Sequence, residues 1–124
     1  MLITMLKSKL HHARVTESEL EYNGSLTIDR DLMDGVRLNP YEKILVANMA
    51  NGERFETYAI PGPRGSGVIC LNGATAHKGT VGDRLIVFAF AQLSEEEVAS
   101  HKPRVTVLDQ NNRPVTTAVA PMEI

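Results

Sequence analysis

Short strand-type segments separated by turn residues dominate the chain, and this pattern restricts the folds that it can adopt. The clearest pair is EKILVANMA, residues 42–50, and RFETYAI, residues 54–60. Asn51-Gly52 lies between them, and Asn-Gly flanked by strand-type runs is a strong hairpin signal. The pattern therefore predicts a β-hairpin over residues 42–60.

The rest of the chain carries further segments of the same kind, each bounded by turn residues or charges. They are ITMLKSKLHHARVT (3–16, one or two strands), SLTID (25–29), VICL (68–71), the apolar part of GTVGDRLIVFAFAQL (79–93) and RVTVLD (104–109). Together with the hairpin they amount to about six or seven short strands, which is typical of a small closed β-barrel.

Helical signals are brief. RDLMDGV (30–36) follows Asp29 as a candidate N-cap and ends near Gly35, while SEEEVASHKP begins at Ser94 with acidic residues in its first turn and closes at Pro103. NGATAH (72–77) is typical of a single helical turn. Because these helices do not alternate with the strands, the pattern disfavours a doubly wound α/β fold. We predict a mainly β, six- or seven-stranded small barrel with short helices.

Length and composition set the broad class. The 124 residues suit one domain over residues 1–124, and 43% hydrophobic residues are enough for a packed core. A net charge of −2 disfavours a general nucleic-acid binder. We expect no membrane partner and a cytoplasmic location, because no signal peptide or long apolar stretch is visible. The segment from about residue 103 to 124 is a weakly defined tail.

Local chemistry alone names no activity. PGPRGSG (61–67) lacks the Gly-Lys-Ser/Thr ending of a phosphate-binding loop. Neighbouring strand residues point to opposite faces, so His11 and His12 are not expected to share a metal ion. The single cysteine, Cys70, is expected to be a small buried residue. The remaining polar residues of the strand-type segments each have an ordinary structural explanation: Lys9, His11, Tyr22, Arg54, Thr57, Tyr58 and Asn72.

The stretch EYNGSLTID, residues 21–29, allows two interpretations. Asn23-Gly24 is a common hairpin turn, in which case Ser25 is an ordinary strand hydroxyl. Alternatively, the Gly24-Ser25 peptide bond is reactive, because glycine tolerates strained backbone angles and the Ser25 hydroxyl lies beside the preceding carbonyl. The residues themselves leave both interpretations open.

Several motifs in the right order resemble the aspartate 1-decarboxylase family, whose pyruvoyl-dependent members make β-alanine for pantothenate. The resemblance covers roughly residues 1 to 93. It implies a double-psi β-barrel and a homotetramer with sites at subunit interfaces, and it leaves open whether maturation needs a helper protein. The matching motifs are MLKSKLHHARVT, LEYNGSLTIDRDLMD, NGERFETYAIPGPRGSG, NGATAH and VGDRLIVFAFAQL.

The resemblance implies that the chain cuts itself between Gly24 and Ser25. Ser25 Oγ attacks the Gly24 carbonyl, the acyl group moves from nitrogen to oxygen, and β-elimination followed by hydrolysis leaves a pyruvoyl group at residue 25. The products are a β-subunit fragment, residues 1–24, and an α-subunit fragment, residues 25–124. Thr57 is implied as the donor to the Gly24 carbonyl oxygen, with Tyr22 in support.

The resemblance also implies how L-aspartate is handled. The pyruvoyl group, the covalent cofactor, forms a Schiff base with the substrate amine and accepts the electrons released with CO2. Tyr58 is implied as the proton donor, although a regular strand places Thr57 and Tyr58 on opposite faces. The implied substrate-binding residues are Lys9, His11, Arg54, Thr57, Asn72, Gly73, Ala74 and Thr75, and no metal is expected.

Two details qualify the resemblance. Many family members carry alanine at the position of Thr75, so the threonine narrows the expected pocket without changing the reaction. A second class of function also stays open: a barrel that keeps the fold but acts as a non-enzymatic binding or assembly module. Observed cleavage at Gly24-Ser25 distinguishes the enzyme from this alternative.

Overall fold

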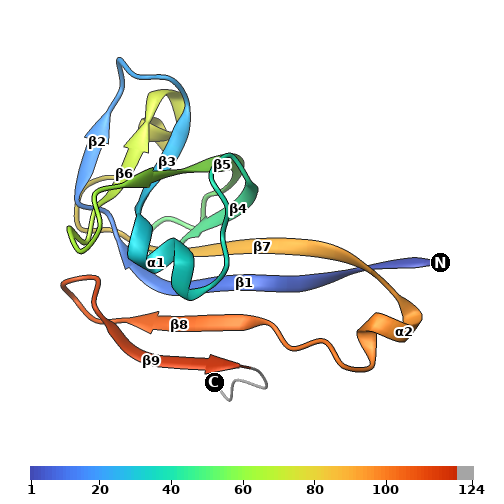
Figure 1. Cartoon of the computed structure of the whole chain (residues 1–124). Helices are drawn as coiled ribbons and strands as arrows, with labels where there is room; N and C mark the ends of the chain where they lie inside the picture. Colours follow the sequence, from blue (N-terminus) through green and yellow to red (C-terminus); the bar gives the residue numbers. More distant parts are fainter. Residues whose placement is uncertain (120–124) are drawn as a thin grey trace.

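The structure is a computed structural model and describes residues 1–119. Its nine strands form one mixed sheet in the order β2-β6-β3-β5-β4-β7-β1-β8-β9. In Figure 1, β1 and β7 run side by side through the middle of the molecule, with β8 and β9 on one side and the remaining strands on the other. The predicted mainly β, small-barrel class with short helices is confirmed.

The elements follow the expected segments closely. The strands are β1 Leu2–Arg14, β2 Glu17–Glu19, β3 Ser25–Asp29, β4 Lys43–Asn48, β5 Arg54–Gly62, β6 Ile69–Asn72, β7 Arg84–Ser94, β8 Arg104–Leu108 and β9 Pro114–Val119. The helices are α1 Arg30–Gly35, the 3₁₀ helix η1 Gly73–Lys78 and α2 Glu95–Val98. The expected count of six or seven strands is too low. The sequence did not indicate β2, which is only three residues long, or β9, which lies in the tail.

The predicted hairpin over residues 42–60 is confirmed, since β4 pairs antiparallel with β5. The Asn23-Gly24 turn is different. β2 pairs parallel with β6, and β3 pairs antiparallel with the other side of β6. The chain between β2 and β3 therefore spans an intervening strand, and Asn23-Gly24 does not form a β-hairpin.

The helix caps are also as predicted. The Asp29 side chain accepts the Asp31 N–H at 2.9 Å, and Ser94 and Glu97 form a reciprocal capping box at the start of α2. The buried Asp29 carboxylate accepts two more backbone N–H groups, from Gly65 at 3.0 Å and Gly67 at 2.9 Å. It thereby ties the end of β3 to the loop that leads into β6.

The tail contains more regular structure than its sequence signals suggest. β8 pairs parallel with β1, and β9 pairs antiparallel with β8. The expected weak definition of residues 103–124 therefore does not apply to these two strands, which are stabilised by pairing with a distant part of the chain. Residues 120–124 lie outside the described residues.

The hydrophobic core lies inside the barrel and fixes which face of each strand points outward. Alternate residues of β1, β3, β4 and β7 enter it, which leaves Ser25 and Thr27 of β3 on the outer face. The largest fully buried side chains are Leu10, Leu26, Ile28, Met33, Ile44, Ile69, Leu71 and Leu85.

Candidate active site

Ser25 is the first residue of β3, and its side chain is enclosed although it faces away from the core. The residue is 1% exposed, and its Oγ accepts a hydrogen bond from Asn72 Nδ2 at 2.9 Å. The Ser25 hydroxyl donates a long bond of 3.4 Å to the carbonyl oxygen of Asn23. A buried hydroxyl is thus fixed directly beside the Gly24-Ser25 peptide bond.

Four polar side chains from β3 and β6 form a compact group, which we call the polar square: Ser25, Thr27, Cys70 and Asn72. In the antiparallel ladder, Ser25 pairs with Asn72 and Thr27 with Cys70, so all four lie on one face of the two strands. Asn72 Nδ2 also donates to Thr27 Oγ1 at 2.7 Å, and Cys70 Sγ donates to Asn72 Oδ1 at 3.1 Å. Sequence reasoning did not assign Thr27 or Cys70 to the site, because their proximity depends on the strand register.

The 3₁₀ helix η1 encloses Ser25 from the next segment of chain. Thr75 Oγ1 lies 2.7 Å from the Asn72 carbonyl oxygen and 3.3 Å from the Ser25 carbonyl oxygen, and Thr75 is 8% exposed. Ala74 is exposed. The predicted pocket residues Asn72, Gly73 and Thr75 are thus gathered around residue 25.

Gly73 is the position at this site that requires glycine. Gly73 has a φ of +62°, and a β-carbon there would come within 2.6 Å of the Tyr22 carbonyl oxygen and 2.8 Å of Gly24 Cα. Gly24 itself has no left-handed φ, and among residues 1–119 no atom beyond its chain neighbours lies within 4 Å of the position that a β-carbon on Gly24 would take. The described structure therefore uses no left-handed backbone angle at Gly24.

A pocket of about 400 Å³ opens beside Ser25. Tyr22 and Tyr58 lie in its wall, and Tyr58 is 36% exposed. The ring of Tyr41 lies 6.4 Å from the ring of Tyr58. Sequence reasoning missed four residues of the wall, which come from irregular loops or the end of β5 and carry no pattern: Asn23, Tyr41, Ile60 and Pro61.

Thr57 and Tyr58 take opposite faces of β5. In the regular ladder with β4, Thr57 pairs with Ile44, which is a core residue, and Tyr58 pairs with Lys43, which is exposed. Only Tyr58 of the two contributes to the Ser25 pocket in the part of the chain that the structure describes. Thr57 is half-buried on the other face.

The predicted cationic residues lie on the outer face of β1, β7, β4 and β5. His11 pairs with Ile86, Ile86 with Ala47, and Ala47 with Arg54, so these residues form one row across four strands. Lys9 lies in the next row, with its Nζ 5.7 Å from the centre of the Phe88 ring. Within the described chain, Lys9, His11 and Arg54 do not line the Ser25 pocket.

His11 and His12 are closer together than strand alternation predicts. Their rings stack with centroids 3.9 Å apart, because His12 has a φ of +69° and the β1–β7 ladder shifts register between His11 and Ala13. The expectation that they face opposite ways is wrong. Burial is the main cause that lowers the pKa of both imidazoles, followed for His11 by His12 and for His12 by the charge of Arg84.

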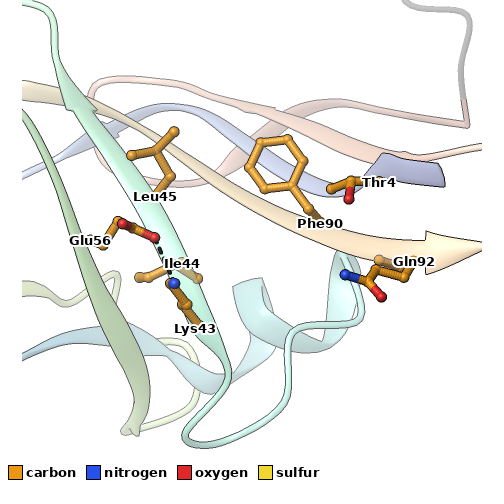
Figure 2. Close-up of a pocket in the computed structure, with 8 residues that line it drawn as sticks. Thr4, Lys43, Ile44, Leu45, Glu56, Phe90 and Gln92 are labelled. Atoms are coloured by element: carbon orange, nitrogen blue, oxygen red, sulfur yellow. Dashed lines mark ion pairs between the residues drawn. The ribbon is translucent and has the colours of Figure 1, made fainter. Parts of the chain in front are cut away.

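A larger hollow, of about 490 Å³, lies on the outer sheet face and, within the described residues, shares no lining residue with the Ser25 pocket. Figure 2 shows the Phe90 ring on one side of it and the ion pair of Lys43 with Glu56, 2.8 Å apart, on the other. Both charged side chains are mostly exposed, so their attraction is weak. The wall of this hollow, as residues 1–119 form it, contains no serine or cysteine, whereas the smaller pocket contains Ser25.

The described residues contain neither a metal-binding cluster nor a helix that could span a membrane. Among residues 1–119, no group of three or more histidine, cysteine or acidic side chains is arranged to hold a metal ion. Over the same residues, none of the helices has the length and apolar character needed to cross a bilayer.

Comparison with known proteins accounts for nearly the whole chain. Residues 1–115 match the family model described as aspartate decarboxylase. The chain is 57% identical to the protein named aspartate 1-decarboxylase from Syntrophobacter fumaroxidans, and the alignment covers 90% of each chain. It is 58% identical to the protein of that name from Exiguobacterium sibiricum, over 90% of this chain and 88% of the other. The Leptospira biflexa protein of that name is 52% identical over 92% of this chain and 98% of its own. The chain therefore belongs to the aspartate decarboxylase family.

Proposed function

We propose that the chain cuts itself between Gly24 and Ser25 and then decarboxylates L-aspartate to β-alanine and CO2. The observation that carries this proposal is the enclosed Ser25 hydroxyl, held by Asn72 at 2.9 Å in the wall of a pocket that also contains Tyr58. Family membership supports the decarboxylation, and the relatives' names give aspartate as their substrate. We propose that this reaction supplies β-alanine for pantothenate synthesis and takes place in the cytoplasm.

The surroundings of residue 25 suit a pyruvoyl group formed from Ser25. The side chain and carbonyl of residue 25 are contacted by Asn72 and Thr75, respectively, and the pocket leaves space for a small substrate on the Tyr58 side. When formed, a pyruvoyl group supplies an electrophilic ketone for an amine and accepts electrons released from a carboxylate. Asn72, Gly73 and Thr75 would hold it, because they already contact residues 24 and 25.

The position of Tyr58 supports a role in proton transfer. Its side chain lies in the pocket wall and retains contact with solvent at 36% exposure. A phenol hydroxyl both donates and accepts hydrogen bonds, so it serves as a general acid when it lies within reach of the reacting carbon. We assign to Tyr58 Oη the return of a proton to the substrate after CO2 leaves.

The two carboxylates of aspartate require cations, and within residues 1–119 the wall of the Ser25 pocket contains none. Arg54 and Tyr58 share a face of β5 but are four residues apart, or about 13 Å along a strand. Arg54 is also absent from the wall of the Ser25 pocket as the described residues form it. We therefore propose a homotetramer in which Lys9, His11 and Arg54 of one copy complete the pocket around residue 25 of another, with Arg54 as a bidentate partner for carboxylate.

The roles of Thr57 and Tyr22 in the cut remain part of the proposal. Tyr22 lies in the same pocket wall as Ser25, which supports a contact with the Gly24 carbonyl region. Thr57 faces away from Tyr58 on β5, so its assignment as donor to the Gly24 carbonyl oxygen requires the strand to bend or a neighbouring copy to contribute it.

Intact-mass spectrometry of the purified protein tests the function. We expect two fragments, residues 1–24 and 25–124, with the second lighter by ammonia than a fragment that begins with serine. Ser25→Ala should give only the intact chain and should release no CO2 from L-aspartate. An intact wild-type chain after prolonged warming, with no CO2 release, would instead support the non-enzymatic binding module.

A further inference from the structure

We propose that Cys70 and Thr27 are positioning residues for self-cleavage: they fix the side-chain amide of Asn72 so that its N–H group points at Ser25 Oγ. This inference rests on the proposed cut at Gly24-Ser25. It adds two residues that touch neither the peptide bond nor the substrate and act only through Asn72.

The geometry of the polar square determines the orientation of the Asn72 amide. Its two N–H donors are both used, on Ser25 Oγ at 2.9 Å and Thr27 Oγ1 at 2.7 Å, and its oxygen accepts from Cys70 Sγ at 3.1 Å. Cys70 and Asn72 are 4% and 3% exposed, so water has little access to replace a lost partner. Rotating the Asn72 amide by 180° would direct its N–H groups at the Cys70 sulfur, which is a weak acceptor. Its oxygen would then accept hydrogen bonds from both the Ser25 and the Thr27 hydroxyl.

The orientation matters because it decides what happens to the Ser25 proton. In the observed arrangement Ser25 Oγ is the acceptor, so its own proton is directed elsewhere, toward the Asn23 carbonyl oxygen at 3.4 Å. During the attack, the Oγ–H bond breaks, a bond forms between Oγ and the Gly24 carbonyl carbon, the Gly24-Ser25 C–N bond breaks, and the proton ends on the Ser25 nitrogen. An N–H donor on Oγ stabilises the negative charge that develops as the proton leaves.

Cys70 is suited to this position because it stays protonated. Burial, and then the nearby carboxylates of Glu17 and Glu19, raise the pKa of the Cys70 thiol above its ordinary value of 9.0. Glu17 pairs with Cys70 and Glu19 with Asn72 across the β2–β6 ladder, so both carboxylates border the polar square. At neutral pH the sulfur is therefore a hydrogen-bond donor to Asn72.

The test measures the rate of cleavage in freshly purified, uncleaved chain by intact-mass spectrometry. We expect Cys70→Ala to slow cleavage about tenfold, since the buried Asn72 oxygen loses its partner. Thr27→Val keeps the side-chain shape, removes the second acceptor and should slow cleavage by a similar factor. Cys70→Ser keeps a donor and should recover the rate to within about threefold of wild type.

Two further variants separate positioning from loss of stability. Val46→Ala shortens a fully buried side chain of β4 on the core face, away from the polar square, and serves as the matched control. It should lower the melting temperature at least as much as Cys70→Ala while leaving the cleavage rate unchanged. Cys70→Val fills the space without a donor and replaces Cys70→Ala if that variant does not fold.

The outcomes distinguish this inference from the function on which it rests. Wild-type cleavage rates in both Cys70→Ala and Cys70→Val would overturn the positioning role while the proposed function stands. A Cys70→Ser variant as slow as Cys70→Ala would also overturn it, because a donor would then give no rescue. Absence of cleavage in the wild-type chain would overturn the proposed function and this inference together.

Discussion

Gly73 lies against the backbone of Gly24, so that a β-carbon on Gly73 would come within 2.8 Å of both the Gly24 nitrogen and its α-carbon. The contact joins the start of η1 to the residue just before the proposed cut. We predict that Gly73→Ala slows cleavage by about 100-fold, because a displacement of about 1 Å at a reacting group has an effect of that size. Intact-mass spectrometry over time measures it.

Gly52→Ala is the control for that change. Gly52 has a comparable left-handed φ of +75°, but within the described residues no atom lies near the position of an added β-carbon. It should cost about 1–2 kcal/mol of unfolding free energy through backbone strain and leave cleavage unaffected. Equal cleavage rates in the two alanine variants would show that the contact between Gly73 and Gly24 has no part in the cut.

The Tyr58 hydroxyl should matter for turnover and not for maturation. Tyr58→Phe keeps the ring in the pocket wall and removes only the proton donor, so we expect normal fragments and at least a 100-fold lower rate of CO2 release. Tyr41→Phe, a change to the neighbouring tyrosine of the same pocket, is the matched control and should retain most of the rate. Unchanged turnover in Tyr58→Phe would remove Tyr58 from the proton-donor role.

The stacked histidines should make stability depend on pH. The pKa of both His11 and His12 is below 6.5 in the folded chain, so the unfolded chain binds protons more readily. The stability that this difference provides is present above pH 6.5 and is lost as the pH falls through the folded pKa values.

Urea unfolding of wild type and of the double variant His11→Gln, His12→Gln at several pH values measures this effect. As the pH falls below 6.5, the unfolding free energy of the wild type should fall more steeply than that of the variant. A gap that stays constant across this range would show that neither histidine contributes to the pH dependence.

The parts of the fold that depend on local chemistry were predictable from the sequence. Asp29 and Ser94 cap helices because a short polar side chain reaches the backbone N–H groups that follow it. The β4–β5 hairpin follows from alternation on either side of Asn51-Gly52. β2 and β9 were missed, since a three-residue strand has too few positions to show a period and β9 begins with a proline.

The candidate site was harder to predict, because it depends on the register of distant strands. Ser25 and Asn72 are named by the resemblance, and their direct hydrogen bond is seen only when β3 and β6 are aligned. Cys70 reads as an ordinary buried residue in GVICL for the same reason. The stacking of His11 and His12 was mispredicted because strand alternation assumes regular backbone angles, and His12 departs from them.

The position of β1 has a consequence for the order of the folding reaction. β1 lies between β7 and β8, so a strand that precedes Gly24 is inserted between two strands that follow it. In the uncut chain, pairing β1 with β7 and β8 would be an intramolecular step, and its rate would not depend on dilution. After a cut at Gly24, the same sheet would contain two separate polypeptides, and recovery from denaturant would become a second-order encounter that slows as the protein is diluted.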